Sequence, residues 1–180
     1  MAAAGTTADM TISSDELVRR NAAFAATGAF AGLRFPTSET LQVLGCVDSR
    51  VDPGVVLGLE LGEGVVMRNI GGRVTPAALR SWALLGRLGR GQPPGSGHLV
   101  ILHHTDCGIT RLAAFPEQLA VFFEIPAGEL DSKAVADPYA AVRVDAALAR
   151  QALPPGRLVS GLVYDVATGL IAVVDPATGQ

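Results

Sequence analysis

The amino-acid sequence predicts an α/β fold: a central, mostly parallel β-sheet flanked by helices, with four parallel strands and a C-terminal antiparallel edge strand. Strand-like and helix-like segments alternate along the chain, which is typical of right-handed βαβ units. The run Leu99-Val100-Ile101-Leu102 is continuously apolar, as strands in the middle of a parallel sheet are. Near the end, Ala167-Thr168-Gly169 separates two strand-like segments and predicts a hairpin.

Capping residues set the expected bounds of the helices. Ser13 and Glu16 fit a capping box at the start of the first helix. Pro53, Pro76 and Pro138 each suit the first turn of a helix, where the N–H that proline lacks would have no partner anyway. We therefore expect helices over residues 13–30, 53–59, 75–88, 107–112 and 137–153.

Apolar runs bounded by turn residues predict the strands. Gly71-Gly72 reads as a tight turn that needs positive φ, because no Lys-Ser/Thr follows it as in a phosphate loop. Residues 1–11 are small and polar and are expected to be disordered, and residues 12–180 should form a single domain. Residues 115–136 show no pattern that assigns them to an element. The expected strands are 41–46, 64–68, 99–102, 158–166 and 170–174.

The composition excludes several classes of function and favours self-association. Only 17% of residues are charged and mean hydropathy is +0.36, whereas about a quarter of residues are charged in an ordinary soluble protein. This deficit predicts apolar surface buried against another copy, in a homodimer or homotetramer. A net charge of −3 without a basic run argues against nucleic acid. No apolar stretch approaches a membrane span and no secretory signal is visible, so we expect a cytoplasmic protein.

Two polar segments follow predicted strands. Cys46-Val47-Asp48-Ser49-Arg50 comes after the first strand, and His103-His104-Thr105-Asp106-Cys107 comes after the strand at 99–102. The carboxyl ends of parallel strands open on the same edge of a sheet, where α/β proteins place their sites. The spacing of His104 and Cys107 brings both side chains to one face of a helical turn. We therefore expect Cys46, His104 and Cys107 to converge.

Two thiolates and one imidazole suit zinc, which is a borderline-soft ion. Cys46 and Cys107 are the only cysteines, and a structural disulfide between them is not expected in a reducing cytoplasm. Three protein ligands leave a fourth position for water, as in catalytic rather than structural sites. A phosphatase-type nucleophile at Cys46 is excluded, because arginine would be needed at position 52, which is Asp.

These segments resemble the β-class carbonic anhydrases, in the short bacterial branch of the family. The family pattern Cys-x-Asp-x-Arg is present at Cys46-x-Asp48-x-Arg50, and His-x-x-Cys is present at His104-x-x-Cys107. Arg68-Asn69-Ile70-Gly71 looks like the Arg-Asn-x-Gly loop between them, and residues 164–169 resemble the terminal hairpin. The resemblance runs from about residue 43 to residue 174.

The resemblance implies one zinc ion per chain on Cys46, His104 and Cys107, with Asp48 and Arg50 as a catalytic pair. In some family members this Asp closes the metal site and is released when the Arg captures it. The implied reaction is the reversible hydration of carbon dioxide to bicarbonate by zinc-bound hydroxide. Asp48 would accept a hydrogen bond from the hydroxide, and Arg50 would keep Asp48 ionised and oriented.

Two other functions remain open. Hydrolases of carbonyl sulfide or carbon disulfide share this fold and these ligands, and carbonyl sulfide is nearly isosteric with carbon dioxide. A non-catalytic zinc-binding protein on the same scaffold is disfavoured, because a structural site does not need Asp48 and Arg50.

For the remaining histidines, Thr105, Asp106 and Trp82, the sequence predicts mainly structural roles. His103 should be packed or hydrogen-bonded, because it points away from His104 on a strand. His98 should lie on the surface or in a loop. Thr105 and Asp106 should cap the short helix that follows, and Asp106 could also orient a metal-site neighbour. Trp82 should lie in the core or in an interface.

Overall fold

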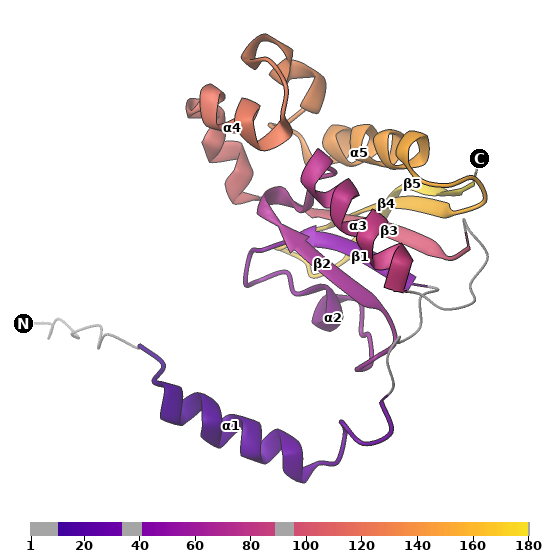
Figure 1. Ribbon diagram of the computed structural model, residues 1–180. Helices are drawn as coiled ribbons and strands as arrows, with labels where there is room; N and C mark the ends of the chain where they lie inside the picture. The colour runs from indigo at the N-terminus through magenta and orange to yellow at the C-terminus, as the bar shows by residue number, and fades with distance from the viewer. Residues whose placement is uncertain (1–10, 34–40, 89–95, 180) are drawn as a thin grey trace, which may run out of the picture. The chain divides into compact units, whose positions relative to one another are not determined.

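The computed structural model describes residues 11–33, 41–88 and 96–179 (Figure 1). It divides into two compact units, residues 1–33 and 34–180. Residues 1–10, which we expect to be disordered, and most of the Gly/Pro-rich loop at 89–97 lie outside the described residues. Whether residues 12–180 behave as one domain stays a prediction.

The first unit contains helix α1, Ser14–Ala26. The expected cap is confirmed, because the Ser13 side chain accepts a hydrogen bond from the Glu16 backbone N–H at 3.2 Å. The helix ends four residues before the predicted Phe30, where Gly28 takes a left-handed φ of 71°. None of its residues is buried within the unit, and Leu17, Val18 and Phe24 are among its exposed apolar side chains.

The second unit is built on the predicted sheet. Its five strands lie in the order β2-β1-β3-β4-β5, with every neighbouring pair parallel except β4 and β5. The predicted fold class is therefore confirmed, including the antiparallel edge strand. The strands are β1 Leu41–Cys46, β2 Val65–Asn69, β3 His98–His104, β4 Leu158–Tyr164 and β5 Ile171–Thr178.

The helices of this unit mostly begin where the capping residues predict. The Asp137 side chain accepts from the Tyr139 backbone N–H at 2.8 Å at the start of α5, and Thr75 Oγ1 accepts from the Ala78 N–H at the start of α3. Helix α2 ends before the predicted Leu59, where Gly58 takes a φ of 65°. The helices and 3₁₀ turns are α2 Pro53–Val56, η1 Ile70–Gly72, α3 Pro76–Leu88, η2 Gly108–Ala114, α4 Pro116–Phe123, η3 Ala127–Lys133 and α5 Pro138–Ala152.

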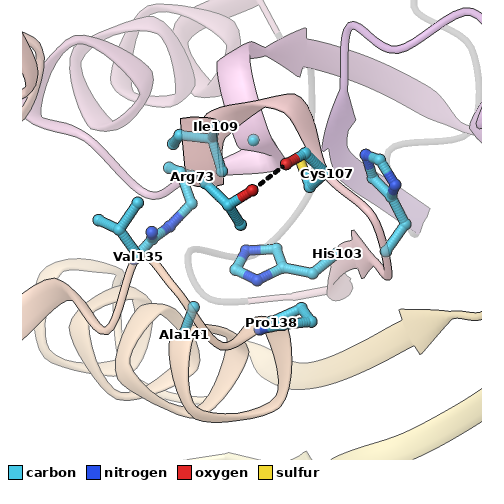
Figure 2. Close-up of a pocket in the computed structure, with 10 residues that line it drawn as sticks. Arg73, His103, Cys107, Ile109, Val135, Pro138 and Ala141 are labelled. Carbon is cyan, nitrogen blue, oxygen red and sulfur yellow. Dashed lines mark hydrogen bonds between the residues drawn. The ribbon is translucent and has the colours of Figure 1, made fainter. Parts of the chain in front are cut away.

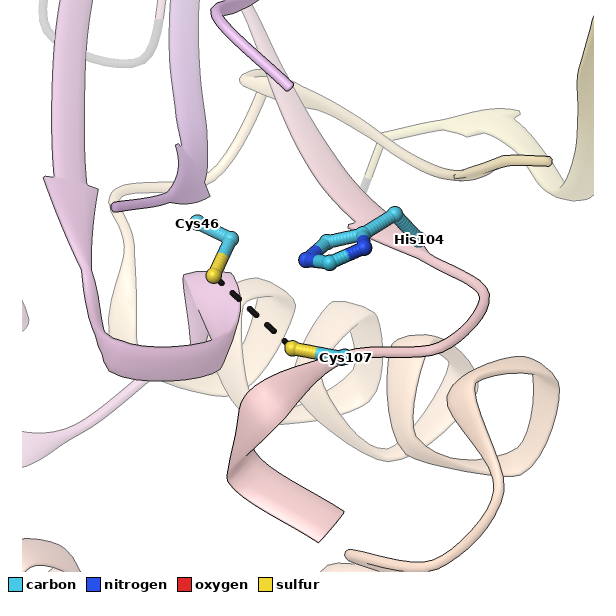
Figure 3. Close-up of side chains that lie close together, drawn as sticks. All are labelled: Cys46, His104 and Cys107. Carbon is cyan, nitrogen blue, oxygen red and sulfur yellow. Dashed lines mark hydrogen bonds between the residues drawn. The ribbon is translucent and has the colours of Figure 1, made fainter. Parts of the chain in front are cut away.

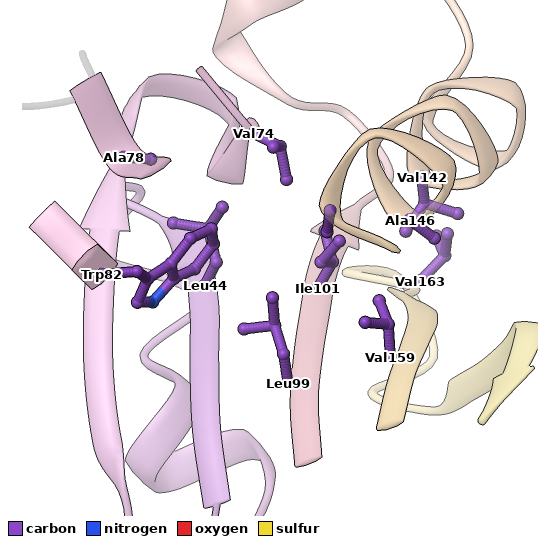
Figure 4. Packing of buried hydrophobic residues seen from close by; sticks show 11 residues of the cluster. Leu44, Val74, Ala78, Trp82, Leu99, Ile101, Val142, Ala146, Val159 and Val163 are labelled. Carbon is purple, nitrogen blue, oxygen red and sulfur yellow. The ribbon is translucent and has the colours of Figure 1, made fainter. Parts of the chain in front are cut away.

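The core lies on both faces of the sheet, because alternate residues of each strand point to opposite sides. On one face, helices α3 and α5 pack against β1, β3 and β4, and Trp82 of α3 lies in this cluster with 5% of its surface exposed (Figure 4). On the other face, Val43, Val100 and Leu102 pack with residues of α2 and its flanking loops. The central strands are covered on both faces, which explains their continuous apolar sequence.

No helix within residues 11–33, 41–88 and 96–179 is both long enough and apolar enough to cross a bilayer.

Candidate metal centre

The three predicted ligands meet at one edge of the sheet. Cys46 is the last residue of β1, His104 is the last residue of β3, and Cys107 directly precedes η2. All three are buried, and their ligand atoms lie within 4.8 Å of one another (Figure 3). The two Sγ atoms are 3.8 Å apart. The three side chains therefore converge as expected, but His104 and Cys107 do not share the predicted helical turn, because His104 ends a strand and η2 covers Gly108–Ala114 rather than residues 107–112.

The geometry and chemistry of these donors fit zinc. Two thiolates on a tetrahedral zinc ion, with Zn–S bonds of about 2.3 Å, are separated by about 3.8 Å, as the Sγ atoms are here. Nδ1 of His104 lies 2.9 Å from the Thr105 carbonyl, which can only accept, so Nδ1 carries the proton. Nε2 then presents its lone pair, is buried, and has no hydrogen-bond partner among the described residues. Such an atom is costly unless something binds it.

The two cysteines form an electrostatically coupled pair. A hydrogen bond from the Cys107 thiol lowers the pKa of Cys46, and the same bond raises the pKa of Cys107. The Cys46 sulfur also accepts from the Asp48 backbone N–H at 3.4 Å, which lowers its pKa further. Cys46 is thus ready to bind a cation as a thiolate, and metal binding would release the proton that remains on Cys107.

Asp48 lies beside the three ligands and is held by Arg50. Arg50 Nη2 donates to Asp48 Oδ2 at 2.8 Å, Arg50 Nε lies 3.1 Å from Oδ1, and the Arg50 backbone N–H donates to Oδ1 at 2.9 Å. These bonds keep the pKa of Asp48 well below its usual range. Asp48 Oδ2 is 3.9 Å from His104 Nε2. An ionised, oriented carboxylate therefore lies next to the metal ligands.

Arg68, which the motif includes without a role, ties the loop after β1 together. Its guanidinium donates to the carbonyls of Cys46 at 2.8 Å and Asp48 at 2.7 Å, and to the Asp52 carboxylate at 2.8 Å. It therefore fixes the backbone that carries both a metal ligand and the acidic residue.

Gly71 and Gly72 form the predicted tight turn, with φ of 76° and 66°. A Cβ atom on Gly72 would lie 2.9 Å from the Leu102 carbonyl oxygen and 3.0 Å from the Cys46 nitrogen. The turn therefore packs directly against the ends of β1 and β3, and only glycine satisfies both the backbone conformation and the space.

Replacing Gly72 with alanine is expected to lower the free energy of unfolding by about 2–3 kcal/mol, because it adds strain at positive φ to a clash with backbone atoms. Urea denaturation measures this change. The matched control is Gly86→Ala in helix α3, where an added Cβ meets nothing within 4 Å. It should leave stability unchanged or raise it by up to about 1 kcal/mol. Equal effects at the two positions would contradict the packing described for Gly72.

The predictions for the residues around the ligands had mixed outcomes. His103 is buried as expected, with Nε2 3.2 Å from Asp145 Oδ2. The capping role of Thr105 and Asp106 was wrong, because η2 begins only at Gly108 and has no side-chain cap.

The two residues have other partners. Thr105 Oγ1 accepts from the Val166 N–H at 3.0 Å, in the loop after β4. Asp106 adopts a left-handed φ of 50° and accepts from Arg50 Nη1 at 2.9 Å, so it does contact a metal-site neighbour. His98 begins β3, as its position before the apolar run predicts, but it is half-buried rather than at the surface or in a loop, and its Nε2 lies 2.8 Å from Ser160 Oγ.

Sequence reasoning missed a buried charged cluster next to the ligands. Figure 2 shows a pocket beside Cys107 that is lined by Arg73 and His103 together with apolar side chains. Arg73 is 1% exposed, and its partner Asp145 on α5 is fully buried. One signal was available: Asp145 falls within the stripe of small apolar residues that faces the core from α5, where an acidic residue requires a partner. The stripe consists of Ala141, Val142, Ala146 and Ala149.

Fold and site together define an α/β protein whose candidate metal site, at the carboxyl edge of the parallel strands, offers two cysteine sulfurs and one imidazole. A family model described as carbonic anhydrase matches residues 41–122. The chain is 32% identical over 174 residues to β-carbonic anhydrase 1 of Mycobacterium tuberculosis, covering 93% of this chain and 100% of that protein. The chain belongs to the β-carbonic anhydrase family.

Two further comparisons bear on structure and substrate. A crystal structure of carbonic anhydrase from Streptococcus mutans superposes with a TM-score of 0.70, at 34% identity, over 92% of this chain and 100% of that chain. A carbon disulfide hydrolase of Acidianus is 34% identical over 88 residues, which cover 49% of this chain and 40% of that protein. These two carbonic anhydrases thus match over more than nine-tenths of the chain, and the carbon disulfide hydrolase matches over about half of it.

Proposed function

We propose that this protein catalyses the reversible hydration of carbon dioxide to bicarbonate, with one zinc ion per chain held by Cys46, His104 and Cys107. The observation that carries the proposal is the buried Cys-His-Cys cluster with the Asp48–Arg50 pair beside it, in a chain that matches a β-carbonic anhydrase along its whole length. The reaction joins water to carbon dioxide and releases bicarbonate and one proton.

Zinc in a site with three protein ligands lowers the pKa of a bound water to about 7 and so supplies the nucleophile. The protein's own groups would orient that reaction. Asp48 is held ionised by Arg50, so it can only accept a hydrogen bond, and its position next to the ligands suits acceptance from the attacking oxygen. This would direct a lone pair of that oxygen toward the substrate.

Arg50 supports this role by holding the Asp48 carboxylate in hydrogen bonds, so that the carboxylate is not free to bind the metal itself. Arg50 is bonded on one side to Asp48 and on the other to both the carboxylate and the carbonyl oxygen of Asp106. A carboxylate bound to Arg50 leaves the fourth metal position to water. We propose that this arrangement is the active one.

Hydrolysis of carbonyl sulfide or carbon disulfide is the second candidate, supported by the carbon disulfide hydrolases among the relatives. The test is stopped-flow hydration of carbon dioxide beside release of H₂S from carbonyl sulfide and from carbon disulfide, with the same zinc-loaded protein. We expect kcat/KM for carbon dioxide to exceed both of the others. A higher kcat/KM for either sulfur compound would overturn the choice of substrate while leaving the metal site intact.

We also propose that the chain acts as a cytoplasmic homo-oligomer. Helix α1 exposes apolar side chains that its own unit does not cover, and the low share of charged residues supports the same view. One structurally similar protein, from Sordaria macrospora, is described as tetrameric.

Light scattering after size-exclusion chromatography should give the mass of a dimer or tetramer. The variant Leu17→Asp, on the exposed face of α1, should shift the mass toward the monomer because it places a charge in the interface. A wild-type protein that is monomeric at micromolar concentration would contradict the proposal.

A further inference from the structure

We propose that Asp145 of helix α5, a residue far from the metal motifs in sequence, is a positioning residue that holds both ligand-bearing segments in place through one buried carboxylate. The inference rests on the zinc site proposed above. It adds to that site a residue whose side chain touches neither the metal ligands nor the substrate but fixes the backbone that carries them.

The Asp145 carboxylate contacts three residues from two separate segments. Oδ2 accepts from Arg73 Nε at 2.7 Å and from the Val74 backbone N–H at 3.1 Å, and it lies 3.2 Å from His103 Nε2. Asp145 is fully buried, and Arg73 and His103 are 1% and 3% exposed. Water therefore competes little for any of these contacts.

The first segment is the turn that supports Cys46. Arg73 and Val74 directly follow Gly71 and Gly72, and Gly72 lies so close to the end of β1 that a Cβ atom on it would be 3.0 Å from the Cys46 nitrogen. Asn69 closes the same turn from its other end, since its side chain accepts from the Arg73 N–H and donates to the Arg73 carbonyl, both at 2.7 Å. Movement of Arg73 would thus move the turn that packs against Cys46.

The second segment is the end of β3, which carries His104. His103 is the residue before this ligand and points to the opposite side of the strand, toward Asp145. A contact at His103 restricts the rotation of the strand end, and with it the direction of the His104 ring. Asp145 therefore links the end of β3, through His103, to the turn after β2, through Arg73 and Val74.

If the pair of Arg73 and Asp145 served only to stabilise the fold, its replacement would have a different effect on zinc binding. Buried pairs can often be replaced by apolar residues without loss of stability, because the desolvation of both charges offsets their attraction. If Asp145 positions the ligands, such a replacement should restore the fold but not the metal affinity. If Asp145 only stabilises the fold, such a replacement should restore the zinc affinity together with the stability.

The experiment measures the zinc dissociation constant of the full chain by competition with a chromogenic chelator, and records the thiolate-to-metal charge-transfer band after cobalt substitution. Asp145→Asn is expected to weaken zinc binding by about 10- to 100-fold, as removal of a supporting hydrogen bond does, and to shift the cobalt band. The control is Asp175→Asn, which removes the carboxylate paired with Arg150 on the same helix. It should leave zinc affinity within about threefold and the cobalt band unmoved, because Asp175 is bonded to Arg150 rather than to the turn after β2 or the end of β3.

Two further variants test the same proposal if the Asp145→Asn protein does not fold. Arg73→Met with Asp145→Leu removes both charges, and Asn69→Ala loosens the same turn without leaving a buried charge. Both should fold and bind zinc more weakly than wild type. Wild-type zinc affinity and an unmoved cobalt band in both would overturn the positioning role. A wild-type chain that binds no zinc would instead overturn the metal site itself, and a zinc-loaded chain inactive on carbon dioxide would overturn only the proposed reaction.

Discussion

Replacement of His104 with asparagine is expected to remove zinc from the protein and to reduce carbon dioxide hydration to the uncatalysed rate. His104 contributes the one nitrogen donor of the Cys-His-Cys cluster, beside two sulfur donors. If the three ligands share a binding free energy on the order of 10 kcal/mol, the loss of one weakens zinc binding by about two orders of magnitude or more. Zinc content by mass spectrometry of metals and the stopped-flow rate measure the two effects.

The matched control is His98→Asn at the other end of β3. His98 contacts Ser160 and no metal ligand, so this variant should keep one zinc per chain and nearly full activity. Zinc retained by His104→Asn, or lost equally in both variants, would show that the cluster is not the metal site.

Replacement of Asp48 with asparagine is expected to keep zinc and lose about 10²- to 10³-fold in kcat, the usual cost of removing one group that orients a reacting atom. The amide is similar in shape to the carboxylate but carries no charge, so Arg50 no longer holds it as firmly. Its NH₂ group can also donate where only an acceptor suits the attacking oxygen. The zinc content and kcat of the same sample separate this effect from metal loss.

Asp106→Asn is the control for the charge around Arg50. The Asp106 side chain is 60% exposed, and Arg50 keeps its bonds to Asp48 and to the Asp106 carbonyl in this variant. An exposed ion pair contributes little, so kcat should fall by no more than about threefold. If Asp48→Asn fell no further than this control, the role given to Asp48 would be wrong.

The sequence was sufficient for the strands and for the convergence of the three candidate ligands because both depend on local signals. Apolar runs mark the buried strands, and the parallel arrangement brings the ends of β1 and β3 to the same edge. Cys46, His104 and Cys107 follow from that geometry and from motif spacing. The capping residues Ser13, Thr75 and Asp137 were correct for the same reason, since a cap acts within three residues of itself.

Other features depend on contacts that a local pattern does not contain. Helix α4 begins after Phe115 without a side-chain cap and ends at Phe123, before Glu124, which adopts a left-handed φ of 54°. The 3₁₀ turn η3, Ala127–Lys133, is too short to show a period. Residues 115–136 therefore gave no readable signal.

The buried pair of Arg73 and Asp145 is a second case. The two residues are 72 positions apart, and each would be assigned to the surface by composition alone. Only the packing of α5 against the sheet makes them partners. A charged residue within an apolar helical stripe is the one local hint of such a pair.

We propose that a zinc ion on Cys46, His104 and Cys107 is required for the hydration of carbon dioxide. The most direct test is to remove metal with a chelator and then titrate the protein with zinc while stopped-flow measures carbon dioxide hydration. The rate should rise linearly with added zinc and reach its plateau at one zinc per chain. A rate that does not depend on zinc, or no hydration at full occupancy, would contradict the account.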